Sequence, residues 1–279
     1  MSAVLAVAGL TIREAIRRRL LAALGVITAV MVGTSAWGFD RLAHAHSLTS
    51  RETRAALPQS LVLFMFMFSF VVALSASVMA SPALAAEVES GVLLTVVTRP
   101  VRRAEVVLGK WLGLAAVLTG YAVAVVAAEE AVVDAVSGYL PPDPALTAAY
   151  LVGEGLLLLT LALALSTRLS GLTGGVLGVA LFGAAWLAGV IGSLGTTLHI
   201  AALRIVGGVS RYVLPTDGLW HGAIYSLEPP ALLGAGDLGR AGDPFLATAA
   251  PSWGYLVWVA VWFATVLTVA VVSFHRREL

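Results

Sequence analysis

The chain has 279 residues, of which 59% are hydrophobic and 12% are charged, and its mean hydropathy is +0.94. A soluble chain could not hide so much apolar surface, so the composition excludes a soluble globular protein and indicates a polytopic membrane protein. The 17 basic and 16 acidic residues nearly cancel, which gives no reason to expect a nucleic-acid partner. Cysteine is absent, which excludes disulfides and thiolate metal sites.

The first 19 residues predict an amphipathic helix ahead of the membrane. Apolar and charged side chains would occupy opposite faces: Leu5, Ala8, Ile12 and Ile16 on one, and Arg13, Glu14, Arg17 and Arg18 on the other. We favour an interfacial helix that lies along the inner leaflet. The alternative is a cytoplasmic extension of the first span that only carries the positive-inside signal.

Six windows are long and apolar enough to cross a bilayer, which takes roughly 20 residues. They are Leu20–Phe39, Leu61–Ala80, Trp111–Val133, Ala145–Ser166, Leu172–Gly195 and Tyr255–Phe274. Basic residues gather in some connections and avoid others, and most of the 17 fall on the side that holds both termini. Because cytoplasmic loops are enriched in Lys and Arg, we expect both termini to be cytoplasmic in an inner or plasma membrane.

The connection from residue 81 to residue 110 carries the one long charged run between two predicted spans. Ser81-Pro82 reads as a helix-start signal, with a capping residue followed by proline at the first helical position. The helix would end near Arg99, because the residue before Pro100 is pushed out of the α region. This predicts a helix-turn unit at the cytoplasmic surface. The alternative is a charged loop that only sets topology.

The residue order in this connection resembles that of ABC-2 type transporter permeases. An acidic pair, a glycine, an apolar run, an Arg-Pro and a Gly-Lys follow one another; the matching residues are Glu87, Glu89, Gly91, Arg99, Pro100, Arg102, Gly109 and Lys110. Six spans, a basic amphipathic N-terminal helix and short outer helices before the last span are also similar to this family. In that family the connection is the coupling helix, which seats in a groove of the ATP-binding subunit. The resemblance thus implies an ATPase docking surface made of Glu87, Glu89, Gly91, Arg99, Pro100, Arg102 and Arg103.

The resemblance implies a single transmembrane permease domain over residues 1–279. It would pair with itself or a close relative and with two copies of an ATP-binding subunit, and it would export cargo. The run from Pro215 to Trp220 looks like the branch that includes permeases of copper-enzyme maturation systems. Two other functions stay open: a membrane scaffold or sensor that recruits a cytoplasmic protein, and an ion-coupled carrier.

An ATPase site in this chain can be tested against the P-loop pattern, in which glycine amides cradle phosphate and a hydroxyl holds magnesium. Gly109-Lys110 is the single Gly-Lys pair, but Ala104 stands at the first glycine position and Trp111 replaces the hydroxyl residue. We therefore expect no enzyme activity, catalytic residue, metal or cofactor site in this chain. ATP and magnesium would bind to the partner subunit.

The long connection from residue 196 to residue 253 predicts short helices on the outer side. Leu198, Ala202, Ile205, Val209 and Val213 have near-helical spacing, and Glu228-Pro229-Pro230 is a stop signal. These helices are too brief and polar to span the membrane. We expect them to dip into the headgroup region or to fold over the end of the bundle.

Acidic residues near the outer ends of spans three and four are candidate polar transport residues: Glu129, Glu130 and Glu154. Glu130 and Asp134 share a helix face at i, i+4 and could form a cation-attracting or proton-linked rim. For the acids of span three we favour a simpler interpretation, in which they mark the outer boundary and reach into the headgroups. For Glu154 both interpretations stay open, because ionisable groups at membrane depth are costly.

Glycines at three- and four-residue spacing begin the fifth span: Gly171, Gly174, Gly175 and Gly178. Small residues at this spacing let helices approach closely, and we expect contacts within one subunit rather than between subunits. His44 and His46 lie near Asp40 in an outer loop, but two histidines without a third clear ligand are weak evidence for a metal. A solvated loop is the interpretation that we favour.

Overall fold

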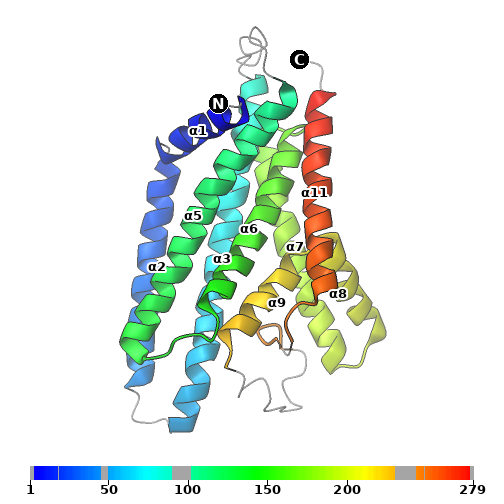
Figure 1. Cartoon of the computed structure of the whole chain (residues 1–279). Helices are drawn as coiled ribbons and strands as arrows, with labels where there is room; N and C mark the ends of the chain where they lie inside the picture. Colours follow the sequence, from blue (N-terminus) through cyan, green and yellow to red (C-terminus); the bar gives the residue numbers. More distant parts are fainter. Residues whose placement is uncertain are drawn as a thin grey trace.

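The computed structural model describes residues 3–17, 19–44, 50–89, 102–229, 243–247 and 249–276, and every regular element in these ranges is a helix. The helices are α1 (Ala3–Arg17), α2 (Arg19–Ala43), α3 (Ser50–Glu89), α5 (Arg103–Ser137), α6 (Pro144–Ser166), α7 (Gly171–Thr197), α8 (Ala201–Val213), α9 (Thr216–Leu227) and α11 (Trp253–His275) (Figure 1). The predicted all-α class is therefore confirmed.

Six helices in the described ranges are long and apolar enough to cross a membrane. They contain the candidate spans Leu21–Ala43, Ala56–Ala85, Arg103–Ser137, Pro144–Ser166, Gly171–Thr197 and Trp253–His275. Each corresponds to one predicted window, so the number and order of the spans are confirmed. Helix α1 and the end of α11 lie at the same end of the bundle (Figure 1), which we call the termini face. Helices α8 and α9 form a hairpin near the opposite end of the bundle, which we call the hairpin face (Figure 1).

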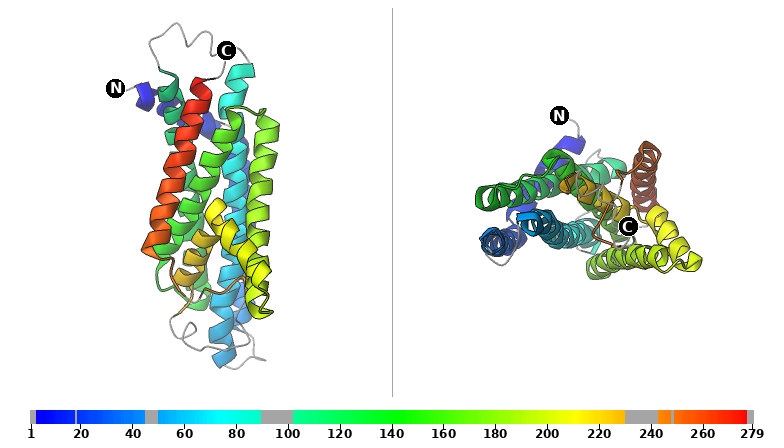
Figure 2. Two further views of the ribbon diagram at one scale, coloured as in Figure 1. Left: turned by 90° about the vertical axis from the view of Figure 1, so that its right-hand side faces the viewer. Right: turned by 90° about the horizontal axis from the view of Figure 1, so that it is seen from below.

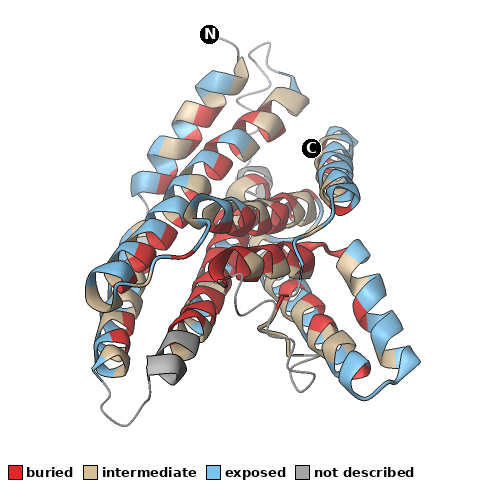
Figure 3. Ribbon diagram, turned by 60° about the horizontal axis from the view of Figure 1, so that its bottom comes forward, coloured by how far each residue is buried: buried red, intermediate tan, exposed pale blue. Residues whose placement is uncertain are grey.

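Buried residues concentrate in the middle of the bundle, whereas the peripheral helices are largely exposed (Figure 3). Leu158, Leu159 and Leu163 of α6 are completely buried. Large apolar side chains such as Val30 on α2 and Val257 on α11 are more than half exposed. Such exposure suits a chain whose solvent is lipid, because hydrocarbon tails are as apolar as these side chains.

Helix α3 continues without interruption from Ser50 to Glu89 and contains Pro82. The predicted helix start at Ser81-Pro82 is therefore wrong. The Ser81 hydroxyl donates to the backbone carbonyl of Gly171, where α7 begins, and Gly171 lies against Pro82. A proline is tolerated inside a transmembrane helix when neighbouring helices and hydroxyls support the local backbone. The predicted helix end near Arg99 lies outside the described residues.

Helix α1 is a separate element that meets α2 at a corner (Figure 1), and the face that it buries against the bundle is lined by small side chains. Ala8, Thr11 and Ala15 are buried, whereas Leu5 and Ile16 are more than half exposed. Small side chains face the bundle because α1 approaches the α5 backbone very closely. The exposed leucine and isoleucine remain available to a bilayer surface.

The close approach of α1 depends on two α5 glycines four residues apart. A Cβ on Gly109 would lie 2.6 Å from Val7 Cβ, and a Cβ on Gly113 would lie 2.7 Å from the Ala8 carbonyl oxygen. Neither distance leaves room for any side chain. The pair therefore acts as a small-xxx-small packing face, which brings α1 onto the termini half of α5.

The glycines at the start of α7 pack within the chain, as predicted. A Cβ on Gly174 would lie 3.2 Å from Ser81 Oγ, and one on Gly178 would lie 2.9 Å from Ser77 Oγ. These serines belong to α3, so the glycine face of α7 joins it to the middle of the bundle.

Helices α8 and α9 form a re-entrant hairpin that enters the bundle from the hairpin face and turns back at Leu214-Pro215 (Figure 2, left). Gly207 of α8 lies against Gly192 of α7, and Leu219 of α9 lies 3.3 Å from the position that a Cβ on Gly153 of α6 would take. Gly153 is nine residues into α6, which corresponds to a depth of about 14 Å at 1.5 Å per residue.

The predicted short helices and the stop at Glu228 are confirmed, but α9 packs among the other helices instead of folding over their ends, whereas α8 lies against α7 with Gly207 as its one buried residue. Most of α9 is buried, including Trp220 and Leu227. Glycines at the contact points let the hairpin lie so close to its neighbours. The sequence pattern indicated the helices but not their depth.

Candidate functional site

The predicted docking surface lies around the end of α3 and the start of α5. Glu87 and Glu89 belong to the last turn of α3, whereas Gly91, Arg99 and Pro100 are outside the described residues. Arg102 is exposed at the termini face, and its backbone N–H donates to Glu105 Oε2 over 2.8 Å. This bond fixes the beginning of α5 in the manner of half a capping box.

Arg103 has a structural contact inside the chain. Its Nη1 donates to the backbone carbonyl oxygen of His275 over 3.2 Å, which joins the first residue of α5 to the last residue of α11. Gly109 and Lys110, which match the family pattern, are buried within α5, where Gly109 contacts α1. The structure thus places Arg102 on a free surface and puts these three residues into contacts within the bundle.

Helix α11 also contacts the turn between α6 and α7 at the termini face. Ser273 Oγ accepts hydrogen bonds from Arg168 Nε over 2.8 Å and from the Thr167 hydroxyl over 2.9 Å. Together with the Arg103 contact, these bonds link the last turn of α11 to the starts or ends of three other helices.

At its other end, α11 holds the tip of the hairpin through three aromatic donors. Trp258 Nε1 donates to the Tyr212 carbonyl over 3.1 Å, Trp262 Nε1 to the Val213 carbonyl over 2.8 Å, and the Tyr255 hydroxyl to the Pro215 carbonyl over 3.0 Å. The last carbonyls of a helix lack partners within that helix. At membrane depth an unsatisfied carbonyl costs several kcal/mol, so these side chains make the re-entrant turn tolerable.

A second set of polar contacts surrounds the buried acids. Glu129 of α5 is completely buried, and its Oε2 accepts from Ser35 of α2 over 2.8 Å. Glu154 of α6 is 3% exposed, and its Oε2 accepts from Ser69 of α3 over 2.8 Å. The structure does not bring the two acids to one hydrogen-bonded site.

The favoured interpretation of the span-three acids is wrong for two of them. Glu129 and Glu130 do not reach the headgroups, since both are buried, and Oε1 of each has no hydrogen-bond partner among the described residues. Only Asp134, one turn further along, is exposed. Because hydroxyl groups on facing helices accommodate buried carboxyl groups, the outer boundary could not be deduced from the acids alone.

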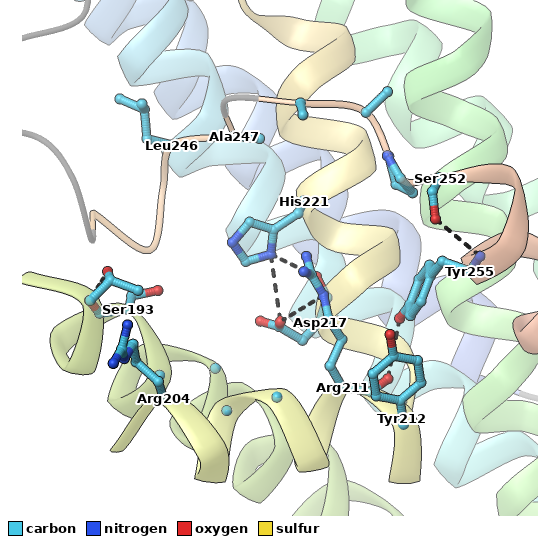
Figure 4. A pocket seen from close by; sticks show the side chains of 18 of the residues that line it. Ser193, Arg204, Arg211, Tyr212, Asp217, His221, Leu246, Ala247, Ser252 and Tyr255 are labelled. Atoms are coloured by element: carbon cyan, nitrogen blue, oxygen red, sulfur yellow. Dashed lines mark hydrogen bonds and ion pairs between the residues drawn. The ribbon is translucent and has the colours of Figure 1, made fainter. Parts of the chain in front are cut away.

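A cluster of polar and charged side chains that was not predicted from the sequence lies at the hairpin tip. Asp217 Oδ2 is 3.8 Å from Arg211 Nε and 3.6 Å from His221 Nδ1 (Figure 4). A Cβ on Gly189 would overlap the Asp217 carboxylate, so only glycine admits this carboxylate beside α7. The i, i+4 spacing of Asp217 and His221 was the one available sequence signal.

The base of α9 is anchored by Tyr139, in the connection between α5 and α6. Its hydroxyl donates to the Leu227 carbonyl over 2.5 Å. Burial raises the pKa of the Tyr139 phenol, and the negative charge of Glu228 raises it further. The hydroxyl therefore keeps its proton and remains a donor well into the alkaline range.

The histidines of the outer loop show no metal-binding arrangement in the part of the chain that the structure describes. His44 Nδ1 lies 3.3 Å from Asp40 Oδ1, and both side chains are exposed, while His46 is outside the described ranges. No group of three or more His, Asp and Glu residues within those ranges could hold a metal ion.

Within the described residues, six helices that are long and apolar enough to cross a membrane, and a hairpin of two short helices at one face, define a multi-pass helical membrane protein. The family model for ABC-2 family transporter proteins matches residues 5–279, so the chain belongs to this family. It is accordingly a membrane permease of an ABC transporter, and the family implies partnership with an ABC ATP-binding subunit. A comparison with curated proteins finds no match.

Proposed function

We propose that this chain is the membrane half of an ATP-driven exporter, with the termini face in the cytoplasm. Two copies, or one copy and a close relative, would assemble with two ATP-binding subunits. Closure of those subunits around ATP would push on the connection between α3 and α5, which includes Glu87, Glu89 and Arg102. The membrane helices would then shift between two packings, and cargo would move outward.

The observation that carries the proposal is the pair of polar contacts at opposite ends of α11. Arg103 bonds the last residue of α11 directly after the proposed docking connection. Trp258 and Trp262 bond the hairpin tip from the other half of α11. A displacement of the start of α5 would therefore be transmitted along α11 to the hairpin. A rigid helix that contacts both regions is one of the elements that can carry coupling between two sites.

The test is co-expression of the chain with its ATP-binding subunit, followed by purification in mild detergent and measurement of ATP turnover. We expect a stable complex whose turnover depends on the permease. Replacing both Trp258 and Trp262 by Phe should leave the complex intact but uncouple turnover from movement of a spin label on α8. Failure of any ATP-binding subunit to co-purify with the wild-type chain would instead favour a scaffold or sensor.

An ion-coupled carrier remains a second candidate because Glu129, Glu130 and Glu154 are buried at membrane depth. Intramembrane carboxyl groups often mark ion or proton pathways. Proton- or cation-dependent transport without ATP would favour this candidate over the exporter.

A further inference from the structure

A pocket of about 650 Å³ lies between the hairpin, α7 and the start of α11. Its lining extends to Thr196 in the last turn of α7 and so reaches the hairpin face, which is the outer side in the proposed orientation. Helix α8 contributes one continuous face to it, through Arg204, Gly207, Gly208, Arg211 and Tyr212. Positions three, four, seven and eight apart share a helix face. Pockets of 300–1,000 Å³ are typical of sites for small organic ligands.

The acidic side chains of the pocket have partners within the chain. Asp217 is paired with Arg211 and His221, and it also lies in the first turn of α9, where a negative charge is favoured. Asp243 Oδ1 accepts from the backbone N–H of Phe245 over 2.9 Å. Asp217 is therefore paired with side chains of this chain, and one oxygen of the Asp243 carboxylate is held by the loop backbone.

Arg204 is the charged side chain of the pocket that lacks such a partner in the part of the chain that the structure describes. It is exposed to the pocket, and its side chain has no hydrogen-bond or ion-pair partner among the described residues. Arg204 and Ser193 lie on one side of the pocket and face His221 and Asp217 across it (Figure 4). One guanidinium group is thus left to bind a ligand that enters from outside.

Two further features favour an anion with an apolar body. Ser252 lines the pocket and caps α11 by accepting from Tyr255 N over 3.3 Å, so the positive end of the α11 dipole lies at the same pocket. The opposite wall is apolar and consists of Leu246, Ala247, Ala249, Ala250 and Pro251.

We propose that this pocket binds a small organic anion, a carboxylate or phosphate monoester carried on an apolar body. Arg204 would bind the anionic group, and the apolar wall of Leu246, Ala247, Ala249, Ala250 and Pro251 would contact the apolar part. The ligand could reach the pocket as a free molecule or as the headgroup of an outer-leaflet lipid, since both present the same anion. All lining residues belong to this chain, so binding at the pocket does not require the ATP-binding subunit.

The experiment measures binding of hexyl phosphate to the purified full chain in a neutral detergent. Arg204→Gln should weaken binding at least about tenfold, as expected when one charge-assisted hydrogen bond is lost. Arg41→Gln is the matched control, because Arg41 is an exposed arginine near the same face and does not line the pocket. It should leave the affinity unchanged.

A second variant fills the pocket without a change of charge. A Cβ on Gly208 would meet no heavy atom within 4 Å, so Gly208→Leu should fold normally and block the pocket. Gly183→Leu is its control, since Gly183 of α7 is equally open and lies outside the pocket. We expect Gly208→Leu alone to abolish binding.

Competition distinguishes the two sources of the anion. Displacement by dihexanoyl phosphatidic acid would identify a lipid headgroup, and displacement by inorganic phosphate alone would identify a free anion; either result supports the site. Equal binding of hexanol and hexyl phosphate would overturn the proposal. Affinity that is unchanged in both Arg204→Gln and Gly208→Leu would overturn it as well.

Discussion

Arg103 Nη1 donates a hydrogen bond to the carbonyl oxygen of His275 over 3.2 Å, although 172 positions separate the two residues. Because of this bond, the neighbouring residues Arg102 and Arg103 have different roles. Arg102 projects from the termini face, whereas Arg103 holds α5 to α11. A joint substitution of both would mix the loss of a docking contact with the loss of an internal one, so the two positions need separate tests.

Reversal of the charge at Arg102 is expected to weaken binding of the ATP-binding subunit. An arginine that pairs with a carboxylate at an interface costs about 2–5 kcal/mol of binding free energy when it is lost. The measurement is co-purification of Arg102→Glu with the ATP-binding subunit. Arg13→Glu, at an exposed position of α1, serves as the control. Full recovery of the complex with normal ATP turnover would show that Arg102 does not take part in docking.

Leucine at Gly113 is expected to displace α1 from α5. The new Cβ would lie 2.7 Å from the Ala8 carbonyl oxygen and 2.8 Å from Thr11 Cβ, and such overpacking costs about 1–3 kcal/mol of stability. Because the chain has no cysteine, Thr11→Cys can report on the contact. Thr11 is buried, so its thiol should become reactive only when α1 detaches.

The matched control for Gly113→Leu is Gly120→Leu. Gly120 is on the same helix, and a Cβ there would meet no heavy atom within 4 Å. The thiol of Thr11→Cys should stay protected in this background. Equal protection in both backgrounds would contradict the close α1–α5 contact.

Glutamine at Glu154 is expected to leave assembly intact and to reduce ATP-coupled transport only modestly. The amide oxygen can still accept from Ser69, so the hydrogen bond survives while the titratable group is removed. Ser69→Ala is the complementary change. It leaves a buried carboxyl group without its hydroxyl partner and should cost about 1–3 kcal/mol of unfolding free energy, measurable by thermal unfolding in detergent.

A complete loss of transport in Glu154→Gln, with the complex intact, would favour the ion-coupled carrier or a cationic cargo. Glu129→Gln should behave in the same way as Glu154→Gln. Glu129 is no less buried, and it has an equivalent serine partner in Ser35. The structure therefore gives no reason to rank the two acids by depth.

Cysteine labelling in intact cells can test the orientation. An impermeant thiol reagent should label Pro142→Cys, in the exposed connection before α6, and should spare Arg276→Cys, in the exposed turn after α11. Both results follow from the concentration of basic residues on the side of the termini. The reverse pattern would place the hairpin face in the cytoplasm.

Sequence alone was sufficient for the class, the six spans, their order and the family resemblance. The reason is that hydrocarbon offers no partner for a backbone N–H or C=O, so every long apolar window must become a helix. The two short helices before the last span were also predictable, because apolar spacing and the stop at Glu228 are local signals.

Tertiary structure decided which helix faces meet and how deeply polar groups lie. The depth of the hairpin depends on the fit of Gly207 against Gly192, and the burial of Glu129 depends on Ser35, 94 positions away. Each of these contacts joins two different helices, so the periodicity of either helix alone does not predict it. For the same reason α1 buries Ala8 rather than Leu5, because the bare backbone at Gly109 and Gly113 favours a small side chain in contact with α5.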